Sequence, residues 1–199
     1  MKLKLLKYPS CLNIGSGSEY REGWMNVDVN ANAIPKPDKI ADIRKLPFPK
    51  NTFSKVYCHH VLEHIPSPIS EVMEELWRVL KPNGELEVHV PHFAFHGAFC
   101  HPEHVHYFDV HTFQHFTPKI LDDAKTNQYP KPICRFELIS CEYRYRETDH
   151  TNTRLSCLKM GMIAIINWFA NHHRDFFDRT MCYWVGGCEE IVVKMKAIK

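Results

Sequence analysis

Several features that define familiar protein classes are missing from this sequence. The eight cysteines include no Cys-x-x-Cys pair, which argues against a zinc ribbon, and a chain of this length needs no disulfides. The opening segment Met1–Lys7 interleaves lysines with leucines and lacks the apolar core of a signal peptide. The most apolar stretch, Leu155–Ala170, is too short and too interrupted to span a membrane. We therefore expect a cytoplasmic protein with reduced cysteines and no membrane span.

The chain also lacks a large excess of positive or negative charge. The formal net charge is +2, and no stripe of Lys and Arg runs along the chain. We therefore do not expect nucleic acid as a partner. Hydrophobic residues make up 44% of the chain and charged residues 24%, which is ordinary for a globular protein. We find no repeat, low-complexity tract or linker, and expect residues 1–199 to form a single domain.

Short apolar runs alternate with helical patterns and turn signals, which predicts an α/β fold. The predicted strands are Cys11–Ile14, Trp24–Val29, Lys39–Ala41, Lys55–Cys58, Glu85–Val90, Arg135–Arg146 and Glu189–Ile198. The last two are expected to form a hairpin-like pair at the sheet edge. Helical spacing predicts helices over Ile69–Leu80 and Leu155–Ala170. We expect an irregular active-site loop over residues 91–118 and a helical insertion over residues 148–187.

The stretch Leu12–Gly17 is the most informative feature that is present. An apolar run there ends in Gly15 and Gly17, and the next apolar run ends at Asp28. Glycines let the backbone approach a ligand closely, and a carboxylate at the next strand end can accept both ribose hydroxyls. Asp28 follows Gly17 by only eleven positions. The usual helix between the first two strands must therefore be very short or missing.

Four segments in order resemble class I S-adenosylmethionine-dependent methyltransferases, and specifically the type 11 methyltransferase domain. They are Leu12–Gly17, Ala41–Phe48, Val61–Ile65 and Arg78–Gly84. The resemblance covers Cys11 to Phe116 well and the last third weakly. It implies a Rossmann-like three-layer sandwich around a mostly parallel seven-stranded sheet with an antiparallel last strand. It also implies S-adenosyl-L-methionine as the cofactor.

The resemblance further implies which residues hold that cofactor. The Gly15–Gly17 turn would approach its methionine part, Asp28 would bind the ribose, and Asp42 would accept from the adenine amino group. The full expected set is Asn13, Gly15, Ser16, Gly17, Asp28, Val29, Asp42, Ile43 and His59. Many relatives carry an acid just before the first glycine for the cofactor's amino group, and here Asn13 is the nearest polar residue. For Asp42 the alternative is a cap on the turn before Pro47.

Histidines are the most unevenly distributed residues, since eleven of the fourteen fall between His59 and His115. Segment Gly97–Phe108 resembles a Gly-x-x-x-x-Pro-x-His pattern found in the family loop. Histidine titrates near pH 6.5 and can take a proton from a nucleophile. The candidate catalytic residues are His59, His60 and His104, and the candidate substrate contacts are His64, His92, His104 and His106.

Plainer roles remain open for several of these residues. At least half of the histidines are expected to pack or lie in solvent, and Glu63 could cap or pair beside the following helix. Segment Cys100–His106 has residue types that bind zinc but no familiar ligand spacing, so we assign no metal. The helix Leu155–Ala170 could be a membrane-surface helix or a dimer face, although a position over the sheet or active site is favoured.

The function that follows is transfer of a methyl group from S-adenosyl-L-methionine to a small-molecule or glycan acceptor by in-line displacement. No Asn-Pro-Pro-Tyr tetrad is present, which disfavours amino methylation of DNA bases. One alternative is a methyltransferase-fold binding module that uses its histidine-rich face for a metal or a partner. Another alternative is an enzyme that uses this fold for chemistry other than methyl transfer. The sequence specifies neither the acceptor nor an oligomeric state.

Overall fold

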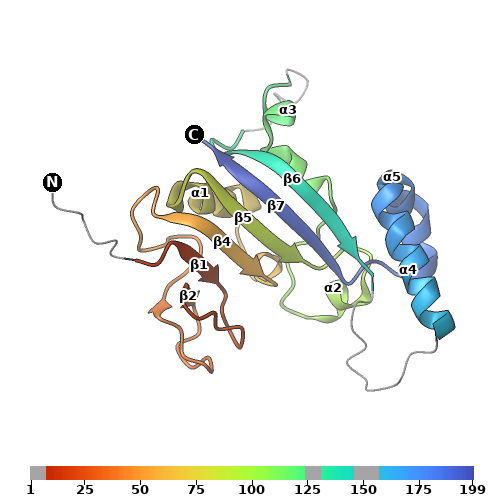
Figure 1. Ribbon diagram of the computed structural model, residues 1–199, viewed down its shortest axis with the longest axis horizontal. Helices are drawn as coiled ribbons and strands as arrows, with labels where there is room; N and C mark the ends of the chain where they lie inside the picture. Colours follow the sequence, from red (N-terminus) through yellow and green to blue (C-terminus); the bar gives the residue numbers. More distant parts are fainter. Residues whose placement is uncertain (1–7, 124–130, 146–156) are drawn as a thin grey trace.

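The computed structural model describes residues 8–123, 131–145 and 157–199, and a seven-stranded sheet forms its centre (Figure 1). The strands are β1 (Cys11–Ile14), β2 (Met25–Asp28), β3 (Lys39–Ile40), β4 (Phe53–His59), β5 (Leu80–Val90), β6 (Arg135–Arg144) and β7 (Glu190–Ile198). Their order across the sheet is β3-β2-β1-β4-β5-β7-β6. Strands β1 to β5 run parallel, and β7 runs antiparallel to both β5 and β6. The predicted topology is therefore confirmed, including the hairpin-like pairing of the last two strands.

The helical elements are short apart from two. They are η1 (Leu62–His64), α1 (Ile69–Val79), α2 (His96–Cys100), η2 (Thr112–Phe116), α3 (Pro118–Leu121), α4 (Cys157–His172), α5 (Arg174–Phe176), the π-helical η4 (Phe177–Met181) and α6 (Cys182–Val185). The predicted start of α4 at Leu155 and the predicted strand end at Arg146 lie outside the described residues.

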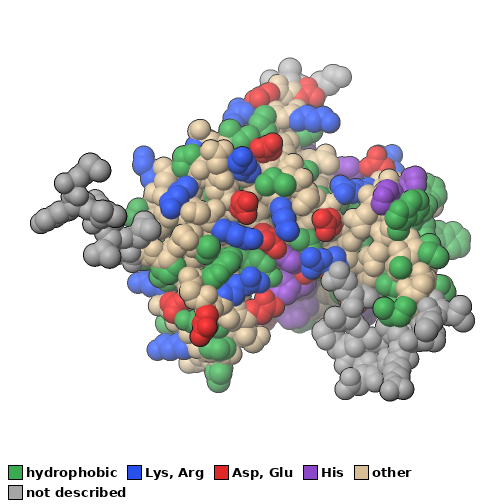
Figure 2. Space-filling view, viewed as in Figure 1, with side chains coloured by type: hydrophobic (Ala, Val, Ile, Leu, Met, Phe, Trp, Pro, Cys, Tyr) green, Lys and Arg blue, Asp and Glu red, His purple; other side chains and the backbone are tan. Residues whose placement is uncertain are grey.

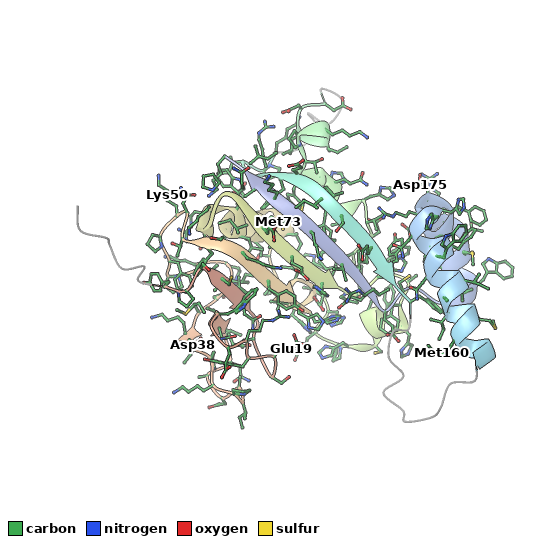
Figure 3. All side chains as sticks on the ribbon, viewed as in Figure 1. Glu19, Asp38, Lys50, Met73, Met160 and Asp175 are labelled. Carbon is green, nitrogen blue, oxygen red and sulfur yellow. The ribbon has the colours of Figure 1, made fainter. Side chains whose placement is uncertain are left out.

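Helix α1 packs on one face of the sheet because its apolar side chains form a single stripe. Val72, Met73, Leu76 and Val79 are all fully buried. Burial of such a side chain contributes about 2 kcal/mol. Figure 1 shows α1 behind β4 and β5, and Figure 3 labels Met73 there. The helix ends when Leu80 turns to extended backbone, and Asn83, with a φ of 61°, lies where the pairing of β5 with β4 shifts in register.

The opposite face of the sheet carries a ladder of opposite charges. Lys55 Nζ on β4 lies 2.8 Å from Glu87 Oε2 on β5, and Glu85 on β5 lies opposite Lys196 on β7. Unlike charges facing each other across strands stabilise their pairing. Figure 2 shows Lys, Arg, Asp and Glu side chains spread over this near face, and no helix of the described chain crosses it in Figure 1. The expected sandwich thus lacks its third layer over these strands.

The missing layer follows from the short connection between β1 and β2, where residues 15–24 contain no helix. A loop needs partners for its backbone polar groups, and buried asparagines supply them. Asn26 accepts from the Arg21 amide at 2.9 Å and donates to the carbonyls of Arg21 and Trp24. Asn13 donates 2.9 Å to Asn26 Oδ1 and 2.7 Å to the Glu19 carbonyl. Two neighbouring strands therefore hold the loop that replaces the first helix.

Helix α4 closes the open edge of β6. The Asn171 amide accepts from the Tyr143 N–H and donates to its carbonyl, both at 2.9 Å. Asn167 does the same for Tyr145, at 2.6 Å and 3.0 Å. Two side chains one helical turn apart thus replace a neighbouring strand, which protects the edge from pairing with another chain. The favoured position of this helix over the sheet or active site is corrected, because α4 stands beside β6 (Figure 1).

Across the residues with described placement, α4 included, we find no helix that combines the length and the apolar character needed to cross a bilayer.

Replacing Asn26 with alanine tests the anchoring of the β1–β2 loop. The side chain makes five hydrogen bonds, and each buried group left unpaired costs about 1–3 kcal/mol. We expect Asn26→Ala to lower the free energy of unfolding by about 3 kcal/mol or more, measured by urea denaturation. Asn32→Ala, at an exposed asparagine, is the control. Equal unfolding midpoints for the two variants would show that the loop does not depend on Asn26.

Candidate active site

The main cleft, with a volume of about 590 Å³, opens at the carboxyl ends of the parallel strands. Strand order reverses direction between β1 and β4, and ligands in open α/β sheets bind beyond such a switch point. The lining residues are Ile14, Gly15, Val27, Asp28, Val29, Asn30, Ala41, Asp42, Ile43, Arg44, His60, Val61, His64, Ile65, Pro66, His101 and Glu103.

Five of the predicted cofactor residues line this cleft. They are Gly15, Asp28, Val29, Asp42 and Ile43. The other four, Asn13, Ser16, Gly17 and His59, are not among the lining residues. For Asn13 the reason is physical, because its buried amide is already occupied by Asn26 and the Glu19 carbonyl.

Gly15 occupies a position that no larger residue fits. Its φ of 65° is left-handed, and an added Cβ would lie 2.1 Å from Cγ2 of Val61. This contact joins the turn after β1 to the segment after β4, which forms the other wall of the cleft. The backbone can therefore approach a ligand closely at this point.

Asp28 shapes the glycine turn and also borders the cleft. One carboxylate oxygen accepts from the Gly17 amide at 2.8 Å, and the other accepts from the Asn30 amide at 2.8 Å. A carboxylate offers about four acceptor positions. Two therefore remain for hydroxyl groups of a ligand in the cleft.

Asp42 is paired with a residue that the sequence reasoning did not single out. Arg44 Nη2 lies 2.5 Å from Asp42 Oδ2, and the Arg44 amide donates to Oδ1. This side-chain hydrogen bonding from Arg44 lowers the pKa of Asp42. Both side chains are well exposed, at 46% and 38%, so water screens the attraction between them. A ligand can therefore displace Arg44 at small cost.

A network of histidines and carboxylates occupies the ends of β4, β5 and β7. Glu190 accepts 3.0 Å from His59 and ion-pairs with His89 at 3.0 Å. The other ring nitrogen of His59 contacts Glu19 at 2.6 Å. Figure 3 places Glu19 near the strand ends. Burial alone would raise the pKa of Glu190, but the hydrogen bonds from the surrounding rings hold it far below its ordinary value. Both ring nitrogens of His59 are thus engaged outside the cleft.

His60 belongs to the same network and also lines the cleft. Its Nδ1 contacts the buried Glu63 at 3.0 Å, and its Nε2 lies 3.5 Å from Glu190. Burial opposes the charge, but the hydrogen bonds with Glu190 and Glu63 outweigh it and raise the pKa of His60 to about 9. At neutral pH the ring is a cation and has no lone pair for a proton. The role expected for His60, contact with the acceptor or removal of its proton, stays a prediction.

Three other histidines gather on the wall of the cleft. The rings of His64 and His104 are 4.6 Å apart, and His101 lies 5.1 Å from His64 and 4.8 Å from His104. His64 and His101 line the cleft, and His104 is not among the lining residues. Burial lowers the pKa of His64, and the neighbouring rings add to this effect. The lowered pKa of His64 favours a neutral imidazole ring on the wall of the cleft.

His92 and His106, both predicted to contact substrate, lie elsewhere. His92 is fully buried and lies 3.1 Å from Asp178, which accepts from the Tyr143 hydroxyl at 2.6 Å. His106 Nε2 donates to the backbone carbonyls of Ile65 and Ser67. The first residue fastens the end of β5 to η4, and the second fastens the loop after α2 to the loop before α1.

Comparison with known proteins agrees with this geometry. Residues 21–88 match the family model of the type 11 methyltransferase domain, described as "Methyltransferase domain". An uncharacterized methyltransferase of Schizosaccharomyces pombe is 48% identical over 46 residues, which are 23% of this chain and 16% of that protein. The sterol 4-C-methyltransferase strm-1 of Caenorhabditis elegans is 43% identical over 49 residues, which are 25% of this chain and 14% of that protein.

A solved structure extends the likeness beyond the short sequence matches. The crystal structure of an S-adenosylmethionine-dependent methyltransferase from Archaeoglobus fulgidus superposes with a TM-score of 0.54 at 16% identity. The superposition covers 96% of this chain and 87% of the other. The fold of the chain is thus that of the class I S-adenosylmethionine-dependent methyltransferases. The match to the type 11 methyltransferase domain covers residues 21–88 of this chain.

The charge on His60 is open to direct measurement. We expect its ring signals in NMR to titrate near pH 9, and Glu63→Gln to move that titration toward the ordinary value of about 6.5. Because the folded-state pKa is raised, this histidine stabilises the fold fully below about pH 6.5, and the contribution is lost as the pH rises toward 9. Titration near pH 6.5 in the unmodified protein would contradict the ion-pair network.

Proposed function

We propose that this chain transfers a methyl group from S-adenosyl-L-methionine to an oxygen or nitrogen atom of a small-molecule or glycan acceptor. The observation that carries the proposal is the placement of two carboxylates, Asp28 and Asp42, and the Gly15 turn around one cleft at the switch point. Their spacing over neighbouring strands suits an adenosine group, with its sugar near one acid and its base near the other.

The residues of the cleft fit the cofactor in a definite way. Asp28 would accept from the ribose hydroxyls through its two remaining acceptor positions. Asp42 would accept from the adenine amino group once Arg44 moves aside, and the Ile43 amide would donate to a ring nitrogen. The Gly15 turn would lie against the methionine part. When bound, the cofactor supplies a methyl group on a sulfonium, which is already an excellent leaving group.

The remaining task of the protein is to align an acceptor and to remove its proton. Neutral imidazole suits the second step, and His64, whose pKa is lowered by burial, offers it on the cleft wall. The His60 cation stands near the same wall and would favour an acceptor group that carries or develops negative charge. The small-molecule class agrees with the sterol named for the nematode relative, and the glycan class rests on family analogy.

The competing proposal is a methyltransferase-fold binding module that uses its histidine-rich face for a metal or a partner. The absent first helix and the bare sheet face favour it. The two proposals differ in one respect, since only the enzyme requires S-adenosyl-L-methionine to bind between the two acids.

Calorimetry with S-adenosyl-L-methionine tests the enzyme proposal. Hydrogen bonds to charged groups contribute about 1.5–3 kcal/mol, so we expect Asp28→Ala and Asp42→Ala each to weaken binding by about 10- to 150-fold. Glu85→Gln removes an exposed carboxylate on the sheet face and is the matched control. Because Asp28 also holds the Gly17 turn, the thermal midpoint of each variant is measured beside its affinity. The proposal would be contradicted by an unchanged affinity for S-adenosyl-L-methionine in both alanine variants, or by no binding to the unmodified chain.

A further inference from the structure

We propose that His64, His101 and His104 form a binding site for a divalent metal ion of the zinc type, open toward the cleft. One ligand atom from each residue lies within 4.8 Å of those of the other two. Three histidines around a tetrahedral ion, with nitrogen–metal distances of about 2.0–2.1 Å, have nitrogen atoms about 3.4 Å apart. Small rotations of the rings therefore suffice to reach metal-binding distance. The fourth position would face the cleft, as in zinc sites that keep one position for water or substrate.

The backbone around these rings is already fixed. His64 ends η1, and the other two follow α2, in a loop tied to η1 by the Val105 amide, which donates 2.8 Å to the Glu63 carbonyl. The Nδ1 atom of His104 lies 2.9 Å from the Ala98 carbonyl. A ring that donates one nitrogen to a backbone carbonyl presents the other as a free ligand, and metal-bound histidines commonly have such a partner.

Binding of a metal through Nδ1 of His101 would give up one contact. The Glu103 amide donates to His101 Nδ1 at 3.3 Å, which is at the long end of the hydrogen-bond range. His101 is exposed, so water can take over from the ring as a partner of this amide. The cost is therefore small compared with a metal–nitrogen bond.

The other candidate group consists of His59, His60 and Glu190, and its histidines have no ring nitrogen free to bind a metal. Both ring nitrogens of each of its histidines face carboxylates. Within the described part of the chain, none of the rings of His64, His101 and His104 forms an ion pair with a carboxylate. Metal binding requires a ring nitrogen with a free lone pair, and no carboxylate of the described residues occupies the nitrogens of these three rings.

With the ion bound, His64 and His101 would serve as its ligands and not as bases, and the ion would activate an alcohol acceptor instead. This role rests on the proposed function. An acceptor hydroxyl bound to the ion at the open position loses its proton to solvent more readily than a free hydroxyl. The alkoxide lone pair then forms the bond to the methyl carbon while the sulfur–methyl bond breaks and its electron pair stays on sulfur. The products are a methyl ether, S-adenosylhomocysteine and one proton released to solvent.

Cobalt(II) titration of the folded chain tests the site by spectroscopy. The exposed Cys100 neighbours His101, so the titration uses a Cys100→Ser background. We expect one cobalt per chain, with visible absorption bands and without the thiolate charge-transfer bands that cysteine ligands give. Loss of one of three ligands in His104→Ala should weaken binding by at least about 100-fold. His111→Ala, at an exposed histidine outside the group, should bind as the parent does.

Several outcomes would overturn the site. These are the absence of cobalt binding at micromolar concentration, equal binding by His104→Ala and His111→Ala, and thiolate bands in the parent spectrum. Asp28→Ala separates this inference from the proposed function, because it should lose S-adenosyl-L-methionine and keep cobalt. Cobalt binding in a chain that never binds the cofactor would overturn the enzyme proposal alone. Cofactor binding in a chain that never binds cobalt would overturn the metal site alone.

Discussion

The hydrogen bond from the Gly17 amide to the Asp28 carboxylate is the interaction on which the cleft depends. It fastens the turn after β1 to the tip of β2, so that the glycine backbone and the acid stay side by side. On its other side the turn is pressed against Val61, where Gly15 leaves no room for a Cβ. The glycine turn therefore holds a fixed position between the tip of β2 and the segment after β4. A ligand that enters meets a backbone and two acids whose spacing the sheet has already fixed.

The short connection between β1 and β2 has consequences far from the cleft. Without a helix there, the sheet face over β4, β5 and β7 is left to water, and its strands carry Lys and Glu in place of apolar residues. The loop instead depends on the buried amides of Asn13 and Asn26. A residue expected to bind the cofactor's amino group thus serves the fold. The same principle recurs at the other end of the sheet, where Asn167 and Asn171 complete the edge of β6.

Local pattern was sufficient to predict the strands, the α1 stripe and the acids at the strand ends. The resemblance implied the mostly parallel seven-stranded sheet with its antiparallel last strand. Contacts between distant parts of the chain were not predictable. His92 meets Asp178, which is 86 positions away, and His59 meets Glu190, which is 131 positions away. Because these carboxylates lie on elements that the sequence reasoning did not connect to the histidines, the cationic state of His60 had no visible signal. The pairing of Arg44 with Asp42 did have a sequence signal, because Arg44 follows Asp42 by two positions. The pairing itself, however, depends on the geometry of the turn.

The histidines divide into two groups by their partners, and this division organises the acceptor side. Those facing carboxylates hold strand ends together, whereas His64, His101 and His104 face one another beside the cleft.

The central claim of the account is that an adenosine group lies between Asp28 and Asp42. A crystal structure of the chain with S-adenosylhomocysteine tests it most directly. The account predicts the ribose hydroxyls on Asp28, the adenine amino group on Asp42 and Arg44 displaced from that acid. A ligand bound elsewhere, or an intact Arg44–Asp42 pair with no ribose at Asp28, would contradict it.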